Sequence, residues 1–273
     1  MTIKDNDDRL RVANAVKKLN SYRSTEYSIE VSDYPPGYFQ GWHRHESFIV
    51  TMLLKGYVRE QTRSGEMLIR PLSSGLRIPG TLHKDVFSPA GVRAIRIAVA
   101  PSFVARLEDE SLVDLSSAMI FDREAVSALL GLSMYLAQTE KVTSIVSEKL
   151  FELFGLLGDR RSSAESDAPR WLLRSKEYLE DTFAEGTQLA HLADLSGVHP
   201  VYFARQFRRF YGCSVGEYRR KLQFQEAVDL LGDRRLSIAE TACSVGFSDQ
   251  SHFSRIFVRE LGITPGRYRR FLT

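Results

Sequence analysis

The 273-residue sequence has little of what an exported or membrane-bound protein needs. Its longest strongly apolar run, residues 48–54, contains a threonine, whereas a membrane-spanning helix requires about 20 predominantly apolar residues. Residues 1–12 are rich in charge, where a secretory signal needs an apolar segment. The two cysteines cannot build a disulfide framework, and neither belongs to a metal-type CxxC pair. These absences predict a soluble, cytoplasmic protein with no membrane partner.

What is present is the composition of a globular chain, with 43% hydrophobic and 26% charged residues. The length suits two domains of about 100–170 residues each. Net charge is +3, and its distribution is uneven. From Arg170 onward 16 lysines and arginines face 12 acidic residues, whereas residues 1–169 carry 21 against 22. A basic C-terminal part is compatible with a polyanionic partner, but charge alone does not decide the matter.

The N-terminal half contains two kinds of sequence pattern, one typical of strands and one typical of helices. Short runs rich in Val, Ile, Tyr and Phe are separated by Gly and Pro turns, which predicts a small β-barrel or sandwich. From Pro101 the periodicity becomes helical, and Asp122 is a candidate cap for a second helix. Residues 145–157 are apolar nearly all round, so this helix needs two partners: a second subunit, or further burial within the monomer. The predicted strand runs are residues 27–31, 48–54, 67–69 and 94–99.

Residues 160–169 are small and polar, and they predict an interdomain linker before a helical C-terminal part. Ser214 with Glu217 and Ser237 with Glu240 both fit the Ser-x-x-Glu capping box. Helix starts are therefore expected directly after each serine.

The C-terminal part contains an internal duplication. A first group of residues recurs 49 positions later and a second group 50 positions later, so one residue is inserted between them, at a turn. Each copy has the layout of a helix-turn-helix, and residues 217–231 predict a helix that joins the copies rigidly. The matches are Ala193, Gly197 and Val198 with Ala242, Gly246 and Phe247, then Arg205, Phe207, Gly212, Ser214 and Tyr218 with Arg255, Phe257, Gly262, Thr264 and Tyr268.

In each copy the second helix has a phenylalanine face and an opposite face of small residues and arginines. With Phe203 and Phe253 set as the buried directions, the outward faces are suited to a major groove about 12 Å wide. A connector of about 15 residues, or about 22 Å, lets two such helices reach successive major grooves. The predicted DNA-binding residues are Val201, Ala204, Arg205, Arg208, Arg209, Gln250, Ser251, Ser254, Arg255 and Arg259.

Residues 187–271 resemble the DNA-binding domain of the AraC/XylS family of bacterial transcription regulators. The diagnostic stretches are IAETA at 238–242, VGFSDQSHFSR at 245–255 and GITP at 262–265. The resemblance implies that Val201, Ala204, Arg205, Gln250, Ser251, Ser254 and Arg255 face bases. Two positions depart from the family pattern: Gln223 replaces the usual Arg of the connector, and Val258 replaces a common Lys.

Residues 27–100 resemble the two short motifs of cupin barrels, through a His43-Arg44-His45 run and a later Pro79-Gly80-x-x-His83. His43 and His45 share one strand face, as do His83 and Asp85, so the four are expected to converge inside the barrel. The glutamate that usually completes a cupin metal site is missing, because Ile49 and Val50 occupy its positions. We therefore expect an effector-binding cluster of His43, His45, His83 and Asp85, with no metal and no cofactor.

Together these patterns predict an α+β chain: a cupin-like barrel with flanking helices, then an all-α domain of two helix-turn-helix units joined by a connector helix. The predicted divisions are residues 1–159 for sensing and dimerisation (helices about 101–159), 160–169 for the linker and 170–273 for DNA binding. The helix-turn-helix units are expected at about 187–212 and 236–262.

The predicted function is sequence-specific DNA binding and transcription regulation in response to a small-molecule effector, without enzyme activity. Double-stranded DNA, the effector, a second copy of the chain in a homodimer and RNA polymerase are the candidate partners. A metal-dependent cupin enzyme with an accessory DNA-binding domain is the alternative, and a sequence-indifferent architectural DNA protein is a third.

Overall fold

The computed structural model describes residues 16–63, 65–109, 118–120, 123–137, 146, 150, 153–154 and 168–272. The chain divides into two compact units. One comprises Met1–Arg160 with Val258–Thr273, and the other comprises Arg161–Phe257. The first boundary falls within the predicted linker, and the predicted domain limits stay a prediction.

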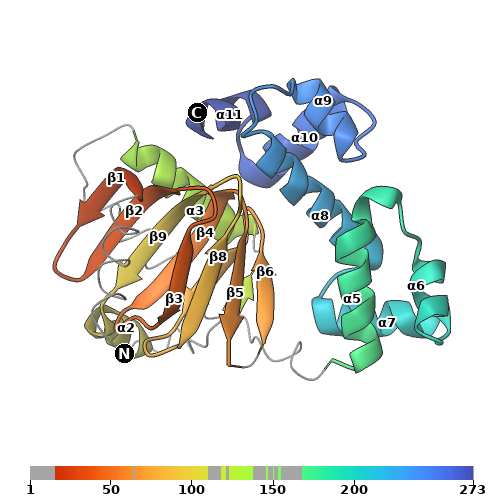
Figure 1. Ribbon diagram of the computed structural model, residues 1–273, viewed down its shortest axis with the longest axis horizontal. Helices are drawn as coiled ribbons and strands as arrows, with labels where there is room; N and C mark the ends of the chain where they lie inside the picture. Colours follow the sequence, from red (N-terminus) through yellow and green to blue (C-terminus); the bar gives the residue numbers. More distant parts are fainter. Residues whose placement is uncertain are drawn as a thin grey trace. The chain divides into compact units, whose positions relative to one another are not determined.

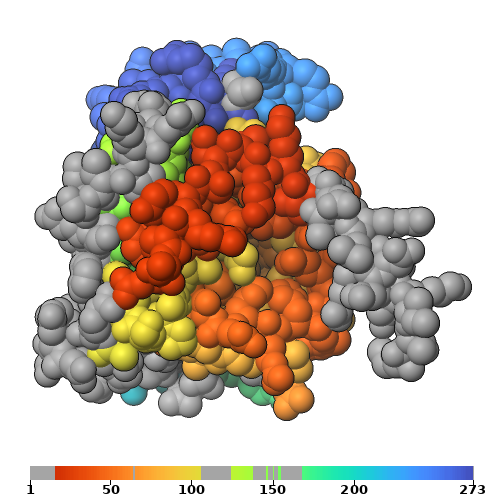
Figure 2. All heavy atoms as spheres, turned by 90° about the vertical axis from the view of Figure 1, so that its left-hand side faces the viewer, coloured from red at the N-terminus to blue at the C-terminus, as the bar shows by residue number. Residues whose placement is uncertain are grey.

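The first unit contains two antiparallel sheets (Figure 1). One has the strand order β1-β2-β9-β4-β7-β10, and the other has the order β3-β8-β5-β6. Figure 2 shows the red segment that includes β1 at the surface, in agreement with its mostly exposed residues. The strands are β1 (Lys17–Arg23), β2 (Tyr27–Tyr34), β3 (Phe39–His43), β4 (Phe48–Lys55), β5 (Val58–Thr62), β6 (Glu66–Ile69), β7 (Ser74–Arg77), β8 (His83–Phe87), β9 (Val92–Val99) and β10 (Ala118–Ile120).

The core of this unit is built by the strands with strong apolar patterns. β9 lies between β2 and β4, pairing Ile97 with Ile29 on one side and with Val50 on the other. All three side chains are fully buried, so the apolar character that marks these strands in the sequence is used for packing. The four predicted runs lie within β2, β4, β6 and β9, and the mixed α+β class is confirmed.

Two helices follow the sheets, α2 (Pro101–Asp109) and α3 (Arg123–Leu136). Pro101 occupies the first helical position, as predicted, because its missing N–H costs nothing there. The proposed cap Asp122 lies outside the described residues. Of residues 145–157 the structure describes only Val146, Leu150, Leu153 and Phe154, and all four are buried.

The second unit is helical, as predicted, and Figure 1 shows α6 and α7 at one end of α8 and α9 at the other. Both predicted capping boxes are present, at Ser214 with Glu217 and at Ser237 with Glu240. None of the helices in the described part of the chain combines the length and apolar character needed to cross a bilayer. The helices are α5 (Arg170–Thr182), the 3-10 helix η2 (Phe183–Glu185), α6 (Leu189–Leu195), α7 (Pro200–Tyr211), α8 (Val215–Leu230), α9 (Ile238–Ser244) and α10 (Gln250–Leu261). The last residues of α10, and the final helix α11 (Pro265–Leu272), belong to the first unit.

Candidate nucleic-acid interface and barrel cavity

The first helix-turn-helix is formed by α6 and α7. Gly197 has a φ of +65°, a left-handed conformation that suits glycine, and it lets the chain reverse between the helices. The imidazole of His199 then caps α7, because its Nδ1 accepts a hydrogen bond from the Val201 amide at 3.3 Å. Phe203 and Phe207 are fully buried against α5, α6 and α8, which fixes the direction of the opposite face.

That opposite face of α7 is open to solvent. Val201 is 70% exposed, although a valine side chain normally gains from burial. The Arg205 guanidinium lies over the Tyr202 ring at 5.6 Å, and the Arg208 guanidinium is 3.6 Å from a Glu217 carboxylate oxygen. On α7 the predicted residues Val201, Arg205, Arg208 and Arg209 are exposed, and Ala204 is half-buried.

The second helix-turn-helix repeats this arrangement with α9 and α10. Gly246 turns the chain with a φ of +89°, and Phe253 and Phe257 are buried with their ring centroids 5.4 Å apart. An Asp249 oxygen accepts a hydrogen bond from the His252 amide at 2.7 Å, and this bond holds the pKa of Asp249 below its usual range. Gln250, Ser251, Arg255 and Arg259 are exposed, and Ser254 is half-buried.

Helix α8 contacts both helix-turn-helix motifs through aromatic side chains. Near its start the Tyr218 ring meets Phe207 of α7, with centroids 5.6 Å apart. Further along, the Phe224 ring meets Phe257 of α10 at 5.3 Å. The two helix-turn-helix motifs are therefore fixed to one helix of 16 residues, about 24 Å long at 1.5 Å per residue.

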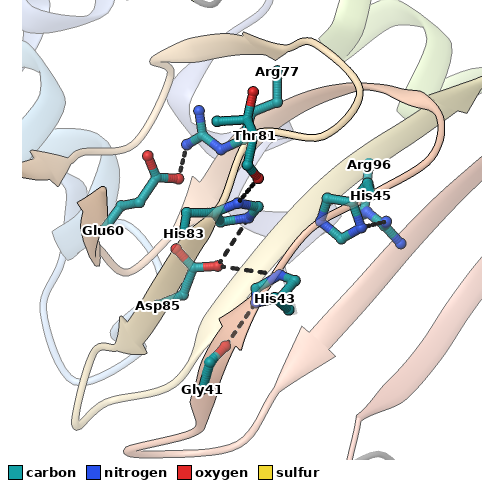
Figure 3. Close-up of polar contacts among 9 residues, drawn as sticks. All are labelled: Gly41, His43, His45, Glu60, Arg77, Thr81, His83, Asp85 and Arg96. Atoms are coloured by element: carbon teal, nitrogen blue, oxygen red, sulfur yellow. Dashed lines mark hydrogen bonds and ion pairs between the residues drawn. The ribbon is translucent and has the colours of Figure 1, made fainter. Parts of the chain in front are cut away.

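In the first unit the four residues predicted as an effector cluster do converge (Figure 3). His43 ends β3 and His45 lies just beyond it, while His83 and Asp85 share the inward face of β8. Nitrogen atoms of the three histidines all lie within 4.8 Å of one another. The backbone pairing of His43 with His83 brings the two cupin-like motifs together.

Backbone and side-chain contacts determine which ring nitrogens of these histidines carry hydrogens. A carbonyl can only accept, so the Nδ1 atoms of His43 and His83 donate to the carbonyl oxygens of Gly41 at 2.8 Å and Thr81 at 3.0 Å. Arg96 can only donate, so the Nδ1 of His45 accepts from its guanidinium at 3.3 Å.

Burial affects the charge of the cluster. It lowers the pKa of His45 to about 3 and that of His83 to about 4, so both rings are neutral at pH 7. Burial likewise raises the pKa of the Asp85 carboxyl, whose Oδ1 has no hydrogen-bond partner in the described part of the chain.

Sequence reasoning missed three charged residues around the same cavity of about 110 Å³. Glu60 and Arg77 form an ion pair, with Glu60 only 2% exposed, and Arg96 projects from β9. The residue two positions earlier in each strand, Val58, Gly75 or Ala94, also lines the cavity, so the period-2 alternation of a strand places these three side chains inside as well. Apolar side chains complete the lining, among them Ile49, Leu53, Val58, Ile69 and Phe87.

Two helix-turn-helix units on a shared connector, with arginines on their outer helices, define a DNA-binding transcription regulator. A helix-turn-helix domain family matches residues 192–270. The probable transcription factor PqrA of Proteus vulgaris is 38% identical over 85 residues, which is 31% of this chain and 70% of PqrA. The chain belongs to the AraC/XylS family of transcription regulators, as the sequence motif predicts.

Other relatives share less of their length. The transcriptional activator RhaR of Escherichia coli is 26% identical over 176 residues, 64% of this chain, and the chain spans about half of RhaR (55%). AdaA of Bacillus subtilis, a bifunctional transcriptional activator and DNA repair enzyme, is 28% identical over 99 residues, 36% of this chain and 47% of AdaA. Among solved structures, ToxT from Vibrio cholerae matches over 91% of this chain and 100% of its own, with a TM-score of 0.38 and 12% identity.

Proposed function

We propose that α7 and α10 lie in successive major grooves of one DNA site and that their outward residues read its bases. The observation that carries this proposal is the repeated geometry: in each helix two buried phenylalanines hold an arginine at the corresponding outward position, Arg205 and Arg255. An arginine can bond guanine O6 and N7 in bidentate fashion, whereas Val201 and Ala204 can contact a thymine methyl. Gln250, Ser251 and Ser254 add hydrogen-bonding groups, and Arg208, Arg209 and Arg259 are placed to approach phosphates.

The barrel cavity supports an effector-binding role. It combines apolar walls with a few converging polar groups, a combination typical of small-molecule sites. An effector that binds two arrangements of the protein with different affinity shifts their populations, which couples the cavity to DNA binding. The same proposal includes a homodimer, RNA polymerase as a partner, a cytoplasmic location and the lack of enzyme activity.

Selection of bound DNA from a random pool, followed by titration of the selected duplex and a shuffled duplex at matched salt, tests the DNA-binding mode. Specific binding by a regulator is typically about 10³-fold or more tighter than its non-specific binding. Equal affinity for both duplexes would favour the architectural alternative, in which phosphate contacts supply all of the binding.

A second candidate function follows from the histidine cluster. Imidazoles beside a carboxylate also occur in metal-dependent cupin enzymes, so an enzyme with an accessory DNA-binding domain is the competing hypothesis. Turnover of a small substrate that is abolished by both His43→Ala and His83→Ala would favour the enzyme. Effector-dependent DNA binding without turnover would favour the regulator.

A further inference from the structure

Two carboxylates lie directly opposite each other inside the barrel. Glu60 of β5 and Asp85 of β8 are paired across the antiparallel strands, and both line the cavity. Glu60 is 2% exposed and Asp85 is 8% exposed, so water screens their charges little. Like charges at directly opposed strand positions are destabilising. This pair therefore requires positive charge or hydrogen-bond donors close to it.

The protein supplies only part of that compensation. Arg77 forms an ion pair with the Oε2 atom of Glu60. The ion-pair contacts of Asp85 within the described part of the chain are with two histidines, and not with a lysine or an arginine. One oxygen of each carboxylate, Oε1 of Glu60 and Oδ1 of Asp85, is buried and accepts no hydrogen bond from any described residue. Both oxygens are therefore available to a donor on a ligand.

A third acceptor lies beside the two carboxylates. The Nδ1 of His83 donates to the Thr81 carbonyl, so its Nε2 carries a lone pair, 3.7 Å from Oδ2 of Asp85. Glu60, His83 and Asp85 offer atoms that all lie within 4.8 Å of one another (Figure 3). Hydrogen bonds of about 2.8 Å from the three N–H groups of an ammonium end on acceptors about 4.6 Å apart. The three acceptors thus match the three donors of one ammonium group.

The neighbouring row of side chains is apolar. Two residues along the same strands, Val58 and Phe87 are also directly opposite each other, and Ile69 is paired with Val58 on the other side. All three line the cavity. Side chains two residues apart in a strand point to the same face, about 6.8 Å from each other. A ligand whose polar end reaches the carboxylates can therefore lay an apolar body along Val58 and Phe87.

We propose that the cavity binds a small primary amine as its effector. The ammonium group donates to Glu60, His83 and Asp85. The hydrocarbon part packs along Val58 and Phe87. A protein cavity of about 150 Å³ can hold benzene, so one of about 110 Å³ suits an amine of about five or six heavy atoms. The inference rests on the proposed effector-binding function and gives that effector a chemical class.

The position of Arg96 provides the contrast with an anionic effector. Its guanidinium lines the same cavity and donates to the Nδ1 of His45. Figure 3 shows the His45–Arg96 pair on one side of His83, and the carboxylates of Glu60 and Asp85 on the other. A carboxylate ligand bound at Arg96 would leave both buried oxygens without a donor. The unpartnered atoms are acceptors, so they favour a ligand that donates.

Isothermal titration calorimetry of the full-length protein with n-butylamine, 1-butanol and butyrate tests the proposal, with EDTA present to remove metal ions. The three ligands are similar in size, but only the amine carries three N–H donors and a positive charge at pH 7. We expect n-butylamine to bind about tenfold or more tightly than either of the others. Asp85→Asn should weaken its binding about tenfold or more. Glu66→Gln, which removes an exposed carboxylate of β6 outside the cavity, is the matched control and should bind normally.

Three results would overturn the assignment. The first is the lack of detectable n-butylamine binding, and the second is equal affinity for n-butylamine and 1-butanol. The third is tighter binding of butyrate that is lost in Arg96→Gln, since the cavity would then select anions. Circular dichroism establishes that each variant is folded. The comparison of ligands uses the unmodified protein, so it decides the matter even if Asp85→Asn unfolds.

Titration of the selected DNA duplex with and without n-butylamine separates this inference from the proposed function. Calorimetric binding of the amine with no change in DNA affinity would contradict the coupling of the cavity to DNA binding, and would leave the amine site intact. Specific DNA binding by a protein that does not bind n-butylamine would overturn the amine site alone.

Discussion

Gln223 of the connector helix closes over Gly246, so that a Cβ at residue 246 would lie 2.8 Å from the Gln223 Nε2 atom. This contact links α8 to the turn of the second helix-turn-helix. The corresponding glycine of the first helix-turn-helix, Gly197, has no atom of this kind within 4 Å. The two turns therefore share a backbone conformation but differ in their surroundings.

We predict that Gly246→Ala destabilises the protein more than Gly197→Ala. Both changes place a side chain in the left-handed region, which costs roughly 1–2 kcal/mol, but only Gly246→Ala must also displace Gln223. Chemical denaturation of the two variants measures the difference. Adding Gln223→Ala should reduce the cost of Gly246→Ala and leave that of Gly197→Ala unchanged, and equal costs in all backgrounds would contradict the steric argument.

The proposed base readout predicts loss of specificity when an outward arginine is removed. Arg205→Ala and Arg255→Ala should each relax preference at one base pair, by about 1–3 kcal/mol. Anisotropy titrations against duplexes that vary each position of the selected site measure the change. Arg23→Ala, on an exposed position of β1, is the matched control. Unchanged ratios across all duplexes would show that these two arginines do not read bases.

A different response is expected from arginines that contact only phosphates. Arg209→Ala should weaken binding to every duplex by a similar factor and reduce the slope of log affinity against log salt by about one. Arg209 suits this test because it is exposed in the last turn of α7, behind the proposed base contacts. Measurements at several salt concentrations distinguish this pattern from sequence-dependent loss.

The buried ion pair predicts opposite outcomes for single and double substitutions. Glu60→Gln should destabilise the barrel by about 3–5 kcal/mol, because it removes the carboxylate that is ion-paired with the buried Arg77. Replacing both residues, with Glu60→Leu and Arg77→Met, should cost much less, since neither charge then remains. Thermal unfolding of the variants provides the comparison, and a double variant as unstable as the single one would refute this account.

The α9 cap predicts a smaller effect that is easily checked. Ser237 accepts a hydrogen bond from the Glu240 amide at 3.1 Å, so Ser237→Ala should cost about 1 kcal/mol of stability. Ser244→Ala, at the other end of the same helix, serves as a control because it removes no N-terminal cap. A cost that is the same for both serines would indicate that the cap contributes nothing specific.

The helical part was predictable because its signals are local and repeated. The capping serines and the turn glycines Gly197 and Gly246 mark element ends, and the phenylalanine spacing identifies the buried faces. The Asp249 cap of α10 was missed although its type and position before the helix are ordinary capping signals. That the base-facing residues contact DNA stays a prediction.

The barrel was less predictable because polar residues occupy its interior. In β8 the inward positions are His83, Asp85 and Phe87, so hydrophobicity does not alternate in the way that marks an ordinary strand. β1 was missed for a related reason, since it is an exposed strand with few apolar residues. The convergence of the histidines was predicted from motif spacing. Which ring nitrogen carries the hydrogen could not be predicted, because it depends on hydrogen bonds to backbone carbonyls whose positions the sequence does not give.

The connector helix α8 carries a consequence for the DNA rather than for the protein. A continuous helix that holds both helix-turn-helix motifs through Tyr218 and Phe224 cannot lengthen or rotate as a flexible linker would. On the proposed binding mode, inserting about five base pairs, half a helical turn, between the two halves of a target would turn one half to the opposite side of the duplex, out of reach. Promoters under such a regulator would then tolerate base changes within each half far better than any change in the spacing between them.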